Sequence, residues 1–192
     1  MRSTFMLFVL LVLFVSPLLA QPPGSDHPGI WEQRVVSVPY QGDVFDRVYY
    51  LYLPENYEQF PDRPLIVNLH GSIDTTQLDS AGQRPEVFMF GRQFTPQYLD
   101  TTRASMMWKV AEAQNVLVAC PLSKSVPAWS PDDPTGNLEY VEAMLQDLEG
   151  TYGAYIDSDR IYATGFSGGG GQTQRLGYYG GARFAAIAPL YY

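Results

Sequence analysis

The chain has 192 residues, of which 46% are hydrophobic and 17% are charged. This length is enough for one domain with a hydrophobic core, and the composition excludes an intrinsically disordered chain. The formal net charge of -8 argues against binding to nucleic acid or to an anionic membrane surface, because both carry charge of the same sign.

The chain has one cysteine, Cys120, and two histidines, His27 and His70. A single cysteine forms no intrachain disulfide, so the stability of the fold depends on its core. Two histidines far apart in the sequence do not indicate a metal site, and we expect neither a metal nor another cofactor.

Residues 1–20 have the layout of a secretory signal peptide. Arg2 supplies a positive charge, residues 5–15 form an unbroken apolar run, and cleavage is expected after Ala20. The alternative is an uncleaved membrane anchor, for which the apolar run is short. We therefore expect an exported protein, secreted or periplasmic, with no stable membrane association after cleavage.

A linker rich in proline and glycine is expected at residues 21–31, followed by one domain over residues 32–192. The domain opens with strands at 32–40 and 46–53, which are rich in tyrosine and valine and are joined by a turn. These two strands predict an antiparallel hairpin. Residues 65–69 form a mostly apolar run, as expected of a strand buried on both faces of a parallel sheet.

Helices and strands alternate in the rest of the chain. We expect helices at 105–114, 138–148 and 168–181, and strands at 116–120, 160–164 and 184–190. The first helix has Met106, Val110 and Ala113 on its expected buried face, and Gly150 is the expected end of the second.

Residues 74–101 show no period and predict a long loop over a site, with at most a short helix. Residues 157–160 are expected to form a turn, with Asp157 and Asp159 as turn formers. A hairpin followed by alternating strands and helices predicts an α/β fold, in which a mostly parallel sheet has helices on both faces.

The segment Gly165-Phe166-Ser167-Gly168-Gly169 follows an expected strand directly and opens an expected helix. A G-x-S-x-G pattern in this position is typical of a nucleophile elbow, in which the serine hydroxyl stands exposed above the sheet. The chain must reverse within one residue, and the flanking glycines let strand and helix approach closely. The Gly168 N–H is expected to point to a forming oxyanion. The alternative is a glycine-rich turn with an incidental serine.

A second feature, His70-Gly71-Ser72, follows the strand at 65–69. In folds with a nucleophile elbow, the loop after this strand supplies another oxyanion donor, and the Ser72 N–H is our candidate. Gly71 lets the backbone approach the site. His70 precedes the serine, whereas the catalytic base of such folds follows it, so we expect His70 to fix the loop by hydrogen bonding.

Three segments together, VYYLYLPENY, PLIVNLHGS and DSDRIYATGFSGGG, resemble the secreted polyhydroxybutyrate depolymerase, feruloyl esterase and acetylxylan esterase group of α/β-hydrolases. The resemblance covers about residues 32–192. It implies an α/β-hydrolase fold and hydrolysis of carboxylic esters through an acyl-enzyme at Ser167, without a cofactor. The implied substrates are hydroxyalkanoate polyesters or acyl groups on plant polysaccharides.

The sequence departs from this group after the serine. The group places its acid and its histidine there, but residues 168–192 contain no Asp, Glu or His. We therefore expect a fragment that lacks the C-terminal part of the fold and has little activity, because a serine without its base is a weak nucleophile. The alternative is a naturally inactive form.

Trp129 is a candidate for stacking on a sugar or on an aromatic acyl group, and the alternative is that it packs under its own loop. Two other functions remain open beside the esterase. One is a serine peptidase of the same superfamily, and the other is a catalytically inactive binding protein of this fold.

Overall fold

The computed structural model describes residues 28–71, 107–123, 129–132 and 136–190, together with the backbone of residues 88–89 and 92–93. The expected signal peptide and most of the linker lie outside the described residues. Of the expected loop at 74–101, only the four backbone positions are described. Within the described residues, no helix is both long and apolar enough to cross a membrane.

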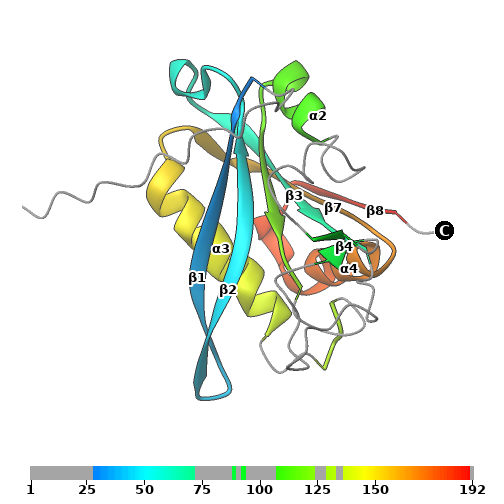
Figure 1. The fold of residues 1–192 in the computed structure, drawn as a ribbon. Coiled ribbons are helices and arrows are strands. Elements are labelled where there is room, and N and C mark those ends of the chain that lie inside the picture. Colours follow the sequence, from blue (N-terminus) through cyan, green and yellow to red (C-terminus); the bar gives the residue numbers. More distant parts are fainter. Residues whose placement is uncertain are drawn as a thin grey trace, which may run out of the picture.

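Six strands form one sheet in the order β1-β2-β6-β3-β7-β8 (Figure 1). The strands are β1 (Ile30–Tyr40), β2 (Asp43–Leu53), β3 (Arg63–Leu69), β6 (Leu117–Pro121), β7 (Ile156–Phe166) and β8 (Ala186–Leu190). β2 pairs antiparallel with β1 and with β6, and the other three pairings are parallel. A separate antiparallel pair joins β4 (Phe88–Met89) to β5 (Arg92–Gln93).

The predicted hairpin is present, and its strands pair from Ile30↔Leu53 to Tyr40↔Asp43. Only Gln41 and Gly42 connect them, and both have positive φ, 52° and 94°. Two-residue hairpin turns with two positive φ angles match the twist of the strands that they join. This tight turn explains why β2 begins three residues earlier than expected.

Helices cover both faces of the sheet, as the sequence predicts. The helices are α2 (Met107–Gln114), α3 (Asn137–Tyr152) and α4 (Gly168–Tyr179), with short 3₁₀ turns η1 (Tyr57–Gln59) and η2 (Gly181–Arg183). The larger hydrophobic cluster joins one face of the sheet to α3 and to Leu176 of α4. The smaller cluster joins the other face to α2.

Two details of the helices differ from the expectation. In α2 the buried residue is Ala111, whereas Val110 is 39% exposed and Ala113 is exposed, so the predicted burial of these two residues was wrong. Met106, the third residue of the predicted face, lies outside the described residues. The helix packs with Met107 and Trp108 against the smaller cluster. In α3 the helix continues past Gly150, because Tyr152 beyond it is buried against the sheet.

The predicted turn at 157–160 lies inside β7 as an irregularity. Asp157 Oδ1 accepts a hydrogen bond from the Asp159 N–H at 2.9 Å. The pairing with β3 shifts from Arg63↔Ile156 to Leu65↔Ile161 at this point. The turn is therefore local, and the strand continues on both sides of it.

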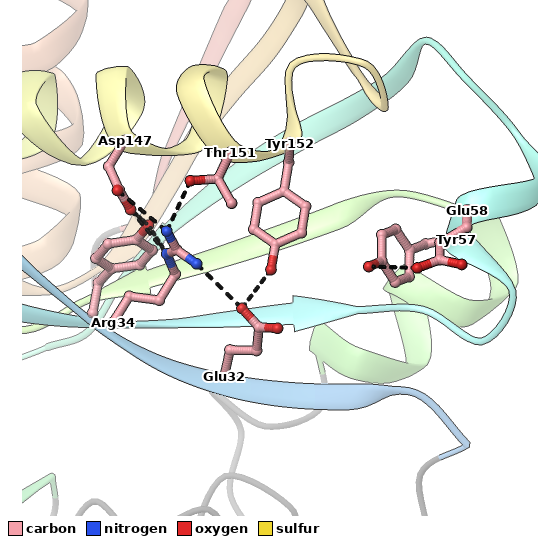
Figure 2. Close-up of polar contacts among 8 residues, drawn as sticks. Glu32, Arg34, Tyr57, Glu58, Asp147, Thr151 and Tyr152 are labelled. Carbon is pink, nitrogen blue, oxygen red and sulfur yellow. Dashed lines mark hydrogen bonds and ion pairs between the residues drawn. The ribbon is translucent and has the colours of Figure 1, made fainter. Parts of the chain in front are cut away.

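A polar network fixes α3 to the hairpin (Figure 2). Arg34 of β1 donates to both carboxylate oxygens of Asp147, at 2.8 and 3.2 Å, and to Thr151 Oγ1 at 2.9 Å. The Tyr49 hydroxyl of β2 donates to the same carboxylate at 2.5 Å. Two strands and one helix thus share the Asp147 carboxylate.

The network continues along β1. Glu32 accepts hydrogen bonds from Arg34 at 3.4 Å and from the Tyr152 hydroxyl at 2.5 Å. The Arg34 guanidinium also lies 5.4 Å from the centre of the Tyr152 ring. These contacts tie the last turn of α3 to the outermost strand of the sheet.

Candidate active site

Ser167 is the single residue between the end of β7 and the start of α4. Its backbone angles, φ 53° and ψ -116°, lie outside the regions that a residue with a side chain adopts without strain. Its N–H donates to the Leu190 carbonyl at 2.9 Å, and its carbonyl accepts from the Gly171 N–H at 3.0 Å. The chain therefore reverses at Ser167, as a nucleophile elbow requires.

Two glycines make this reversal possible. A Cβ on Gly169 would lie 2.2 Å from the Leu69 carbonyl oxygen, and a Cβ on Gly165 would lie 2.5 Å from the Gly169 carbonyl oxygen. No side chain fits at such distances. The first turn of α4 can therefore lie against the ends of both β3 and β7 only because these two residues are glycines.

The loop after β3 meets the turn at Ser167. A Cβ on Gly71 would lie 3.6 Å from Ser167 Cβ and 3.3 Å from the Phe166 carbonyl oxygen. Ser72, the expected second oxyanion donor, lies outside the described residues. Ser167 itself is half-buried, and among the described residues none forms a hydrogen bond with its hydroxyl.

His70 is buried, and both of its ring nitrogens contact backbone groups. The Ser123 N–H donates to Nε2 at 3.0 Å, so Nδ1 carries the proton and donates to the Gly71 carbonyl at 2.7 Å. Burial, together with a smaller effect of the positive charge of Arg47, lowers the pKa of His70 to about 4, although the hydrogen bond to Gly71 opposes the shift. His70 is thus neutral at neutral pH, and neither nitrogen is free to accept a proton from Ser167.

Trp129 lies inside the protein with 3% of its surface exposed. Its indole N–H donates to the His70 carbonyl at 2.8 Å, and its backbone N–H donates to Ser123 Oγ at 2.9 Å. This position corresponds to packing under the loop, the alternative to stacking on a ligand. The ring does not face solvent in this structure.

Sequence reasoning missed the residues that hold this region together. Ser123 contacts His70 through its backbone N–H, for which a sequence carries no signal. Arg47 is fully buried, donates to the Leu122 carbonyl and to Asn137 Oδ1 at 3.2 Å each, and stacks 4.1 Å from the Tyr140 ring centre. A lone arginine in the apolar segment DRVYYLYL was the one available signal for such a role.

No general base lies among the groups brought together here. Residues 168–190, the described part after the serine, contain no Asp, Glu or His. The described part of the chain also holds no group of three or more His, Cys, Asp or Glu side chains able to bind a metal ion. The site consists of a strained serine and, beside it, a loop fixed by hydrogen bonds.

No family model matches the chain, and no curated protein matches its sequence. Solved structures do match. FphF, a fluorophosphonate-binding serine hydrolase of Staphylococcus aureus, aligns with a TM-score of 0.55 and 16% identity over 84% of this chain and 56% of its own. A ferulic acid esterase aligns with a TM-score of 0.52 and 13% identity, over 83% of this chain and 58% of its own.

A third match is the S-formylglutathione hydrolase FrmB of Staphylococcus aureus, with a TM-score of 0.52 and 14% identity over 81% of this chain and 55% of its own. The chain thus spans little more than half the length of these structures. Identities this low establish the fold and nothing finer. Together with the mixed sheet and its helices, they confirm the predicted fold class: the chain has the α/β-hydrolase fold over the part that it spans.

Proposed function

We propose that the chain belongs to a serine hydrolase of carboxylic esters in which Ser167 is the nucleophile. The observation that carries this proposal is the backbone of Ser167, strained at φ 53° between a strand and a helix, with Gly71 packed beside it. Strain persists where the surrounding structure enforces it, and it clusters at functional sites. Several structures of similar fold are named as esterases, which supports ester substrates.

In the proposed reaction, Ser167 Oγ forms a bond to the ester carbonyl carbon, and the C–O bond to the alcohol breaks. The proton of the hydroxyl leaves with the alcohol, and water then hydrolyses the acyl-serine. The Gly168 N–H and the Ser72 N–H are proposed to stabilise the oxyanion. Gly168 is the first residue of α4, where N–H groups have no partner within the helix.

The proposed substrates are hydroxyalkanoate polyesters or acyl groups on plant polysaccharides, since the three sequence segments resemble that group of enzymes. We propose that the enzyme is exported, on the strength of the signal-like residues 1–20. Neither proposal depends on the packing of Trp129.

The acid and the base of the reaction are proposed to belong to a part of the fold that this sequence does not include. Two observations support this. The matched structures are nearly twice as long as the part that the chain spans, and residues 168–192 contain no Asp, Glu or His. The 192 residues alone should therefore turn over p-nitrophenyl acetate slowly or not at all.

The test is to read the gene past the codon for Tyr192 and to assay the encoded protein on p-nitrophenyl acetate. We expect an Asp and then a His in an α/β pattern, and turnover that Ser167→Ala abolishes. A stop codon directly after Tyr192 in a full transcript would contradict the fragment and favour an inactive form. Fast turnover by the 192 residues that depends on Ser167 would show that an unrecognised base exists.

A further inference from the structure

Ser167 is held by hydrogen bonds on both sides of its Cα atom. Its N–H donates at 2.9 Å to the carbonyl of Leu190, the last residue of β8, and its own carbonyl accepts from the Gly171 N–H at 3.0 Å. The angles φ and ψ describe how the two flanking peptide groups are rotated about the Cα atom, and each peptide group is planar. Two fixed peptide groups therefore maintain the strained conformation of Ser167, with φ 53° and ψ -116°.

The hydrogen bond of the Ser167 N–H depends on how closely β8 approaches α4. A Cβ on Gly170 would lie 2.5 Å from the Leu190 carbonyl oxygen, and a Cβ on Gly177 would overlap Ile187 Cδ1. Both glycines belong to α4 and both of these neighbours belong to β8. An alanine at position 170 would therefore have to displace either the Leu190 carbonyl or the first turn of α4.

The end of β8 is placed by β7 as well. The two strands pair in parallel up to Phe166↔Leu190, and the Thr164 hydroxyl donates to the Ala188 carbonyl at 2.8 Å. The Leu190 side chain, by contrast, is 54% exposed. The position of the Leu190 carbonyl therefore depends on backbone contacts to β7 and α4 and not on burial of its side chain.

We propose that the end of β8 positions the nucleophile: the Leu190 carbonyl holds the peptide group that precedes Ser167, and Gly170 lets α4 come close enough for this bond. The inference rests on the proposed function, since it takes Ser167 as the nucleophile. Gly170 and Leu190 are positioning residues, because both act through the backbone of Ser167 and neither touches the substrate in this account. Without the bond, the strained φ should relax and move the hydroxyl, and a misplacement of about 1 Å can lower a rate about 100-fold.

Two measurements on the 192-residue chain test this proposal, and Gly170→Ala is the variant. Hydrogen exchange followed by nuclear magnetic resonance reports the Ser167 N–H, with the Val67 amide in the centre of the sheet as the reference for global unfolding. Labelling by an alkyl fluorophosphonate reports the reactivity of the Ser167 hydroxyl, relative to the exposed Ser158. In Gly170→Ala the Ser167 amide should exchange about tenfold faster relative to Val67, and the labelling of Ser167 relative to Ser158 should fall about tenfold.

The matched control is Gly171→Ala, at the next residue of the same helix. A Cβ there meets nothing within 4 Å, and alanine keeps the N–H that binds the Ser167 carbonyl, so both ratios should stay at their wild-type values. Thr164→Val removes the donor to the Ala188 carbonyl and keeps the shape of the side chain. It should change both ratios in the same direction as Gly170→Ala, and it serves as the test if the alanine variant fails to fold.

A folded Gly170→Ala chain with wild-type values of both ratios would overturn the proposal. Faster exchange without slower labelling would overturn it as well, because the bond would then hold β8 but not the nucleophile. An equal response of Gly171→Ala would overturn it too, since the response would then be a general loosening of α4. The exchange measurement needs no reaction at Ser167, so failure of the proposed function would be seen separately, in the Ser167→Ala assay on p-nitrophenyl acetate.

Discussion

Ser167 has a backbone conformation that costs about 1–3 kcal/mol, and its neighbours must enforce it. The enforcement comes from close packing: the first turn of α4 lies against the ends of β3 and β7 where Gly169 and Gly165 have no side chain. The geometry of the proposed nucleophile therefore depends on glycines that have no side chain to take part in the chemistry.

This dependence predicts that Gly169→Ala lowers the free energy of unfolding by about 3 kcal/mol, because its Cβ would overlap the Leu69 carbonyl oxygen. The matched control is Gly171→Ala in the same helix, where a Cβ meets nothing within 4 Å. That change should raise stability by about 0.5–1 kcal/mol through helix propensity. Urea unfolding of both variants measures the difference, and equal effects would contradict the packing argument.

The buried, neutral ring of His70 predicts that the stability of the fold depends on pH. Its pKa is lowered to about 4 in the folded chain and is ordinary, near 6.5, when unfolded, so the unfolded state binds the extra proton between these values. The free energy of unfolding should therefore fall as pH drops from about 6.5 to about 4, by up to about 1.4 kcal/mol per pH unit. His70→Gln, which does not titrate, should show a flatter pH profile. A wild-type profile that is equally flat would show that His70 is not buried as a neutral ring.

Single residues were predictable where a motif fixes their spacing. Ser167 and its flanking glycines follow from G-x-S-x-G placed between a strand and a helix. The partners of His70 were not predictable, because one is a backbone N–H and the other an indole 59 residues away in sequence. No periodicity connects such groups before the chain has folded.

At the scale of elements, α3 is held to the hairpin by a shared carboxylate as well as by apolar burial. Asp147 accepts from Arg34 and from Tyr49, and these hydrogen bonds hold the pKa of Asp147 below its usual value although burial opposes the shift. The ionised Asp147 carboxylate therefore stabilises the folded state above about pH 4. This stabilisation is lost as the pH falls through the lowered pKa of Asp147 and the carboxylate takes up a proton.

Asp147→Asn should lower the free energy of unfolding by about 1 kcal/mol at neutral pH, because it removes the negative charge that Arg34 and Tyr49 bind. The effect should be no larger, because the ion pair with Arg34 is partly exposed and water screens the attraction between the charges. The difference from wild type should shrink in acid. Asp157→Asn is the control, because its partner Arg160 is 46% exposed, compared with 22% for Arg34, so water screens this ion pair more strongly and it should contribute little. Comparable effects of the two substitutions would mean that the Asp147 network does not stabilise the docking of α3.

Element types were predictable from periodicity, and element details were not. The strands and helices expected in the described residues are present, because buried parallel strands and amphipathic helices have distinct patterns. The face of α2 was mispredicted, since its packing depends on Trp108 lying against a cluster formed by distant strands. The end of α3 was mispredicted because burial of Tyr152 outweighs the low helix propensity of Gly150.

For the molecule as a whole, the order of elements predicted an α/β fold with a mostly parallel sheet, and the resemblance of three segments to known enzymes narrowed this prediction to the α/β-hydrolase fold. A hairpin followed by alternating strands and helices leaves few topologies open, and the right-handed crossover rule narrows them further. The substrate could not be predicted from the order of elements, because the choice of substrate depends on individual side chains around the site. Residues 74–101, the expected loop over the site, show no sequence pattern from which such side chains could be identified.

Export is a prediction about the whole chain. If residues 1–20 are a signal peptide, the protein recovered from the outside of the expressing cell should begin at Gln21. N-terminal sequencing of the secreted protein measures this directly. Recovery of a membrane-bound chain that begins at Met1 would favour the uncleaved anchor instead.

The most direct test of Ser167 as a nucleophile uses an alkyl fluorophosphonate and peptide mass spectrometry. Attack by the serine forms an O–P bond, breaks the P–F bond and releases the proton with fluoride. Labelling should be slow without a base, but in the folded chain Ser167 should react faster than an exposed serine such as Ser158, because the proposed oxyanion donors would act on the same transition state. The preference should vanish in urea. Labelling of Ser167 no faster than that of Ser158 in the folded chain would contradict the account.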